Sequence, residues 1–137
     1  RRQRQMCIRD RLSEEGVVVI NVGRSPIDRS LIDAMVTTLQ AVFPSVHVMD
    51  IPNTLNTMVY ATVQPTEISA LIENYQTLRN DPQTHPLLLH AIEQVILHQQ
   101  PLPEPTIVFT DDKAPVEWVV NRMVLEFMFS GELEVLR

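Results

Sequence analysis

Residues 16–22 read Gly16-Val17-Val18-Val19-Ile20-Asn21-Val22, a run of β-branched residues that begins at a glycine and is followed by Gly23. An uninterrupted apolar run of this length is typical of a strand that is buried on both faces, as in a parallel sheet. A strand of that kind needs parallel neighbours. The run therefore predicts an α/β protein, and because no such neighbour precedes residue 16, we expect the chain to be part of a larger domain.

The residues that follow this strand have the form of a helix start. Ser25 can accept hydrogen bonds from free amides, and Pro26 suits the first helical position. Asp28 carries a negative charge close to the positive end of the helix dipole. Apolar residues then recur at helical spacing until Pro44, which cannot continue a helix. We expect one helix over residues 26–43.

Two further strands are expected after this helix. Residues 46–51 and 57–63 are rich in apolar and β-branched side chains, and the turn-forming residues 52–56 separate them. Because the connection is short, the two strands are predicted to pair as an antiparallel hairpin.

Three helices and one extended linker are predicted in the remainder of the chain. Thr66 can cap the first of these helices, and Gly131 is the expected cap at the end of the last. Prolines 101, 103 and 105 indicate a stiff linker, and residues 107–109 indicate a short strand or extended segment. By the spacing of their apolar residues, the helices are expected at residues 66–78, 87–98 and 115–130.

Residues 1–11 differ from the rest of the chain in composition. They hold five of the 11 Lys and Arg residues and one of the 17 Asp and Glu residues. One choice of codons for residues 1–10 reproduces a transposase sequencing adapter read in frame. We therefore interpret residues 1–11 as an adapter-derived segment of irregular structure, rather than as a basic arm for nucleic acid or membrane. The natural domain is expected to occupy residues 12–137.

The remaining residues are acidic and contain no cysteine. Six basic and 16 acidic residues remain, a net charge of −10, which argues against a nucleic-acid partner. Cys7 lies within the adapter-derived segment, so no disulfide or thiolate is expected beyond it. The four histidines lack the spacing of a metal-ligand pair, and no apolar run approaches the ~20 residues that span a bilayer. We expect a cytoplasmic protein without a metal site.

Two adjacent acids stand out in residues 110–117, which read Thr-Asp-Asp-Lys-Ala-Pro-Val-Glu. Asp111 and Asp112 can neutralise the start of the helix that Pro115 opens. Alternatively, one of the two carboxylates lies at the rim of a substrate pocket and attracts a cationic amine.

Asn21 likewise has a functional and a purely structural interpretation. It lies at the carboxyl end of the first predicted strand, which is where ligands bind in open α/β sheets. It can equally serve as a turn-forming polar residue before Gly23. Asn21, Asp111 and Asp112 are therefore the candidate substrate-pocket residues of this chain.

Several segments resemble spermidine-synthase-like proteins, the polyamine aminopropyltransferase group with the class I S-adenosylmethionine-dependent methyltransferase fold. Residues 110–117 resemble their Thr-Asp-Asp-x-Ala-Pro-Val-Glu segment. Residues 16–21 are similar to their Gly-x-Leu-Val-x-Gln/Asn strand, and residues 42–46 are similar to their Leu/Val-Phe-Pro-x-Val helix exit. Residues 51–52 and 56–62 resemble their loop and the return strand of their hairpin. Together these segments extend over nearly all of the chain beyond the adapter-derived residues.

The resemblance implies the C-terminal half of a Rossmann-like methyltransferase fold. Residues 16–22 would be its fifth strand, 26–43 a crossover helix and 46–63 the terminal antiparallel hairpin, followed by three helices. The intact protein would use S-adenosylmethionine or its decarboxylated form as co-substrate and transfer a group to a small-molecule amine or a similar nucleophile. The family's glycine-rich loop, ribose-binding acid and catalytic aspartate belong to earlier strands. The resemblance therefore implies no catalytic residue and no cofactor-binding residue in this part.

Two departures from the family pattern argue against aminopropyl transfer to putrescine. Asn53-Thr54-Leu55 stands where the family has an aromatic residue and a proline that bind the polyamine, and Asn21 replaces the usual glutamine. The alternative function is a non-catalytic domain of the same fold that serves association. The apolar helix 115–130 would then be its contact, and a homodimer is one expected assembly.

Two expectations concern the chain and its parent as wholes. Some spermidine-synthase-like proteins are fused to membrane-transporter-like segments. The longer protein that would contain this chain is therefore expected, as one alternative, to have an upstream membrane segment. In the isolated chain, the strand at 16–22 is expected to have an exposed edge and apolar faces, which favours self-association.

Overall fold

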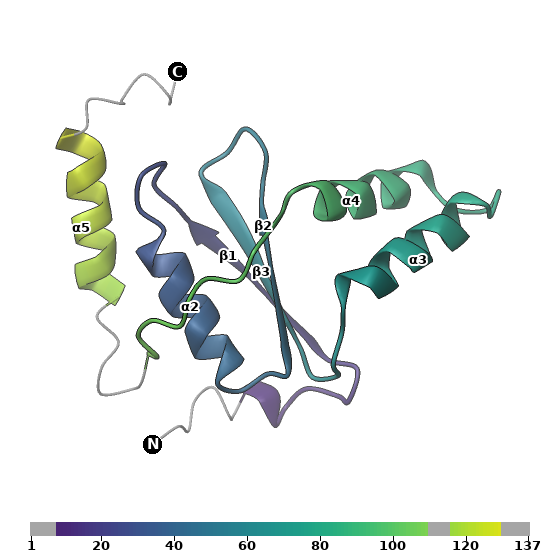
Figure 1. Cartoon of the computed structure of the whole chain (residues 1–137), viewed down its shortest axis with the longest axis horizontal. Coiled ribbons are helices and arrows are strands. Elements are labelled where there is room, and N and C mark those ends of the chain that lie inside the picture. The colour runs from purple at the N-terminus through teal and green to yellow at the C-terminus, as the bar shows by residue number, and fades with distance from the viewer. Residues whose placement is uncertain (1–7, 110–115, 130–137) are drawn as a thin grey trace.

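The computed structural model describes residues 8–109 and 116–129, which form a four-stranded sheet with helices on both sides (Figure 1). The helix α2 (Ser30–Gln40), backed by α5 (Val116–Phe129), covers one face of the sheet. The helices α3 (Ile68–Arg79) and α4 (Pro86–Leu97) lie on the other side as a helical hairpin. The sheet has the order β1-β3-β2-β4, formed by β1 (Val17–Gly23), β2 (Ser45–Asp50), β3 (Asn56–Thr62) and β4 (Gln99–Gln100).

All strand pairings among the described residues are antiparallel. The return strand β3 lies between β1 and β2 and is antiparallel to both, so β1 and β2 run in the same direction without being neighbours. The helix α2 connects these two strands by crossing over β3. The predicted mixture of helices and strands, the crossover helix and the antiparallel hairpin are thereby confirmed, whereas the described strands contain no parallel pair of the kind expected for a Rossmann-like sheet. The short strand β4, which pairs with β2, was not predicted.

The prediction that the first strand is buried on both faces is wrong. Side chains alternate along a strand, and α2 covers only one face of β1. Val22 on that face is buried, whereas Val17 and Val19 on the other face are 51% and 49% exposed. β1 is also an edge strand of the described sheet, with an antiparallel rather than a parallel neighbour. The expectation of an exposed edge is therefore confirmed, and of the two apolar faces expected to be exposed, one is exposed and the other is covered by α2.

The hydrophobic core lies between the sheet and α2. Ile32 and Val36 of α2 and Val48 and Val59 of the two central strands are almost completely buried. Full burial of such side chains contributes about 1.5–3 kcal/mol each. Val119 of α5 joins the same cluster.

The helix α2 begins four residues later than predicted, at Ser30 rather than at residue 26. The Ser25 hydroxyl accepts the Ile27 amide at 3.3 Å and so closes a local turn before the helix. Asp28 accepts the amide of Ser30 at 2.8 Å and satisfies one free donor at the true start. The Ser-Pro pair therefore shapes the turn that leads into α2 instead of its first helical turn.

The three later helices are found close to their predicted positions, with different first-turn contacts. Glu67, not Thr66, occupies the cap position of α3 and makes no capping side-chain bond. Thr66 instead donates its amide to the Ser45 hydroxyl at 2.9 Å, which ties the start of α3 to the sheet. The side chain of His85 caps α4 by accepting the Leu87 amide at 3.1 Å.

The proline-containing linker runs in extended form from β4 back to α2 (Figure 1). The amides of Thr106 and Phe109 donate to the hydroxyls of Thr37 and Thr38, at 3.1 and 2.8 Å. The second bond is buried, as is the Phe109 side chain. The linker is thus extended as predicted, and residues 107–109 form no strand.

Candidate functional site

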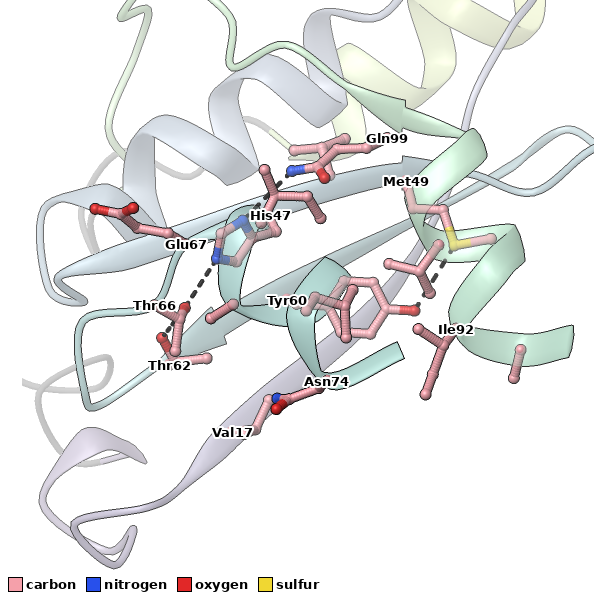
Figure 2. A pocket seen from close by; sticks show the side chains of 16 residues that line it. Val17, His47, Met49, Tyr60, Thr62, Thr66, Glu67, Asn74, Ile92 and Gln99 are labelled. Carbon is pink, nitrogen blue, oxygen red and sulfur yellow. Dashed lines mark hydrogen bonds between the residues drawn. The ribbon is translucent and has the colours of Figure 1, made fainter. Parts of the chain in front are cut away.

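A pocket of about 400 Å³ lies between the sheet and the α3–α4 hairpin (Figure 2). The pairing register places Tyr60 opposite both Val19 and His47, and Met49 opposite Met58. Directly opposed residues point to the same face of a sheet, so these side chains lie on the side away from α2, where Tyr60, His47 and Met49 form the floor of the pocket. The helices supply the opposing wall. Side chains that line the pocket from both sides include Val17, Met49, Tyr60, Leu71, Ile92 and Val95.

The Tyr60 hydroxyl is a polar group in a mainly apolar part of this pocket. It donates to the thioether sulfur of Met49 at 3.9 Å, which is a weak acceptor. Burial raises the pKa of Tyr60 above its ordinary value of 10.0, so the hydroxyl stays protonated at neutral pH. Tyr60 therefore offers a bound molecule a neutral hydrogen-bonding group, not a phenolate nucleophile.

A chain of hydrogen bonds runs through His47 at one end of the pocket (Figure 2). His47 Nε2 lies 2.9 Å from the Thr66 hydroxyl, which lies 3.1 Å from the Thr62 hydroxyl. Thr62 donates its one proton to the carbonyl of Gln64 at 2.7 Å, so Thr66 must donate to Thr62. His47 Nε2 then donates to Thr66, and Nδ1 accepts from the Gln99 amide at 3.5 Å.

This direction of the hydrogen bonds decides what the His47–Thr66 pair can do chemically. A general base for a threonine nucleophile must accept the hydroxyl proton. Here the imidazole of His47 donates to the hydroxyl, and Thr66 gives its proton to Thr62. The arrangement thus holds the side chains in place, with His47 Nε2 as a hydrogen-bond donor. It suits binding better than covalent catalysis.

A second polar cluster centres on Asp50, at the carboxyl end of β2. Arg29 donates to both carboxylate oxygens at 2.8 and 3.1 Å, and the Thr57 hydroxyl donates at 2.6 Å. Arg24 Nε lies 3.6 Å away. Burial alone would raise the pKa of Asp50, but these hydrogen bonds and the two arginine charges lower it below its ordinary value. With both oxygens occupied, Asp50 anchors the strand ends and is a poor candidate for a general base.

The helix α5 is held to the start of α2 by a separate ion pair. Arg122 donates to Asp28 at 3.0 Å and to the Ser30 hydroxyl at 2.9 Å. The same guanidinium lies 5.2 Å from the centre of the Trp118 ring, within cation–π range. These contacts position α5 and leave the pocket on the opposite side of the sheet unaffected.

The predicted site residues are only partly covered by the structure. Asn21 is exposed in β1 opposite Met58, on the same sheet face as the pocket floor, and it is not among the described residues that line the pocket. Asp111 and Asp112 lie outside the described residues. In the described ranges, no three His, Cys, Asp or Glu side chains gather closely enough to hold a metal ion.

The pocket itself was not predicted from the sequence. His47 and Tyr60 are isolated polar side chains in apolar strands, and the alternation in β2 and β3 was the one signal that could have placed them together.

Helix length gives a further observation: across residues 8–109 and 116–129, no helix is both long and apolar enough to cross a membrane.

Comparison with known proteins adds no assignment, because no protein-family model, curated protein or solved structure matches the chain.

Proposed function

We propose that this chain forms the C-terminal part of a spermidine-synthase-like transferase domain that uses S-adenosylmethionine or its decarboxylated form. The main support is the order of elements: a strand, a crossover helix, an antiparallel hairpin and three helices. This is the order that the resemblance of residues 16–62 and 110–117 implies. Within the larger domain, the chain would supply one end of the sheet and part of the acceptor pocket.

The free edge of β1 is a second observation that supports this proposal. The Gly16 carbonyl accepts the Val63 amide at 3.1 Å, and the Arg24 amide donates to the Leu55 carbonyl at 2.8 Å. Hydrogen-bonded and non-bonded pairs alternate in an antiparallel ladder, so the even-numbered residues of β1 bond to β3. The backbone groups of Val17, Val19 and Asn21 therefore point away from the described sheet. A parallel strand of a larger α/β domain would fit this edge.

Asn21 is the residue of this chain that we assign to the acceptor pocket. It is exposed, and it lies towards the carboxyl end of β1, where open α/β sheets bind ligands. Its amide can orient an amine or hydroxyl acceptor by hydrogen bonding, which is a positioning role. We infer similar contacts for Asp111 or Asp112. The proton acceptor would come from another part of the domain, since Asp50 is fully engaged.

The acceptor is proposed to be an amine or similar nucleophile other than putrescine. The β2–β3 turn contains Asn53 with a backbone φ of 58°, a left-handed conformation that asparagine tolerates. Asn53-Thr54-Leu55 in this turn carries no aromatic ring to stack against a polyamine.

Isothermal titration calorimetry with the longer protein encoded by the natural gene tests the proposal. We expect it to bind S-adenosylmethionine or its decarboxylated form. Asn21→Ala should raise KM for the acceptor and leave the affinity for the S-adenosyl compound unchanged. Asn80→Ala, in the exposed turn after α3, is the matched control and should change neither quantity. Absence of binding to both S-adenosyl compounds would refute the assignment.

The outer face of α5 favours a second candidate function, a non-catalytic association module. Trp118 and Leu125 are 62% and 52% exposed and lie two helical turns apart on this face. An apolar stripe of this kind is suited to a contact between two copies of the domain. Sedimentation of Leu125→Glu, with Glu93→Gln as control, distinguishes the two functions. The module predicts weaker association for Leu125→Glu and no S-adenosyl binding by the longer protein.

A further inference from the structure

The α3–α4 hairpin is attached to the sheet mainly at its base. The start of α3 is tied through Thr66 to Ser45, and the end of α4 through the His98 carbonyl, which accepts the Asp50 amide at 3.2 Å. Between these points, neither helix contains a buried side chain. The pocket therefore separates two apolar surfaces that do not fill the space between them. Such a gap leaves both surfaces without the close contacts of a packed core.

The charges around the pocket restrict what it can hold. Glu67 is the one carboxylate among its described lining residues, and no Lys or Arg lines it. Glu67 accepts a hydrogen bond from Ser69 at 3.2 Å, and its carboxylate retains further acceptor capacity. The lining thus favours a cation over an anion of the same shape.

We propose that this pocket binds a small molecule with an apolar body and a single primary amine. The apolar body would lie between Leu71 and Ile92 of the hairpin and the Tyr60 ring of the sheet. The ammonium group would lie at the end formed by His47, Thr66 and Glu67 (Figure 2). The volume of about 400 Å³ is within the range of small-molecule sites.

The same lining disfavours two related classes of ligand. A carboxylate would meet Glu67 and find no Lys or Arg side chain among the described residues that line the pocket. A diamine with charges at both ends would bury one of them among apolar side chains, which is costly without a partner. This inference does not rest on the proposed transferase function, because it involves neither Asn21 nor an S-adenosyl compound.

Titration of the isotope-labelled chain with matched compounds, followed by NMR, tests the proposal. The probes are phenylbutylamine, phenylbutanol, phenylbutanoate and hexanediamine. We expect saturable shifts for residues of β3, α3 and α4. The amine should bind about two- to five-fold more tightly than the alcohol, as expected for one solvent-exposed ion pair. The carboxylate and the diamine should bind more weakly than the alcohol. Binding should also slow hydrogen exchange in the hairpin, because it links the two apolar surfaces.

Variants of the pocket separate this site from non-specific binding. Ala91 is a small, exposed residue that lines the pocket, so Ala91→Phe should fill it and weaken amine binding at least ten-fold. Ala41→Phe, at the exposed end of α2, is the control and should bind normally. Ala70→Phe fills the same pocket from α3 and is the substitute if Ala91→Phe perturbs the shifts of core residues. Glu67→Gln should remove the preference for the amine over the alcohol.

Three results would overturn the proposal. The first is the absence of saturable shifts with phenylbutylamine. The second is equal binding by the wild-type chain and a well-folded pocket-filling variant. The third is binding of phenylbutanol or phenylbutanoate as tightly as the amine. Failure of S-adenosyl binding in the longer protein would bear on the transferase proposal alone.

Discussion

The two faces of the sheet differ in how they are covered. On one face, α2 packs directly against β1, β2 and β3, and Val36 and Val59 are fully buried. On the other face, the α3–α4 hairpin contains no buried side chain, and Leu87 remains 67% exposed. The helices on both faces carry apolar residues at helical spacing. Such spacing shows which side of a helix is apolar, and close packing against a partner decides how much stability that side provides.

The largest expected difference between the two faces concerns truncation of one isoleucine on each. Ile32 is 1% exposed, and Ile32→Ala should reduce the free energy of unfolding by about 2–5 kcal/mol. Ile72 of α3 is 38% exposed, and Ile72→Ala should cost less than about 1 kcal/mol because little packing is lost. Urea denaturation measures both values. Equal losses would show that the hairpin packs as tightly as α2.

The next largest effect is expected at the Asp50 cluster on the α2 face. Asp50→Asn should cost about 1–3 kcal/mol at neutral pH, since it removes charged hydrogen bonds with Arg29. The pKa of Asp50 is lowered on folding, so its contribution is present above its ordinary value of 3.8 and is lost as pH falls through the lower folded value. Wild type and variant should therefore converge in stability in strong acid. Urea titrations at several pH values check this, with the exposed Glu93→Gln as control.

A smaller effect, about a ten-fold change in self-association, is expected at the edge of β1. Val19→Pro removes an amide that points away from β3, and proline is tolerated at such edge positions. The fold should persist while association weakens by about 1.4 kcal/mol. Ile20→Pro is the matched control, because it removes an amide bonded to β3 and should unfold the chain. Analytical ultracentrifugation and circular dichroism measure the two results. Unchanged association of Val19→Pro would exclude this edge as the contact.

The smallest effect is expected within the hairpin itself. His85→Ala removes the cap that accepts the Leu87 amide and should destabilise α4 locally by about 0.5–1 kcal/mol. Hydrogen exchange in the first turn of α4 should accelerate, with little change in global unfolding. His90→Ala, on the exposed surface of the same helix, should leave exchange unaltered. Because neither helix of the hairpin contains a buried side chain, we expect the hairpin to open separately from the core. A matching loss of global stability in His85→Ala would contradict this expectation.

The elements that could be predicted from the sequence are those specified by neighbouring residues. The hairpin of β2 and β3 follows from two apolar runs and a short turn. The later helices follow from apolar spacing and prolines, whereas the predicted cap Thr66 does not cap α3. The start of α2 was misplaced because Ser25 and Pro26 suit a turn as well as a helix start, and Ser25 bonds to Ile27. Whether helices cover one or both faces of β1 could not be predicted, because a run of valines is compatible with either arrangement.

The candidate site depended on contacts between residues far apart in the chain. Asn21 could be proposed from its place at the end of a strand, whereas the His47 chain and the pocket required the hairpin to lie over the second sheet face. By itself, the sequence determined β1, β2, β3, the approximate positions of the helices and the acidic character of the chain, because these depend on local spacing and composition. Only the tertiary structure decided that Arg29 meets Asp50 and that Phe109 returns to Thr38. Those contacts arise when packing brings distant segments together, and no local pattern of residues encodes them.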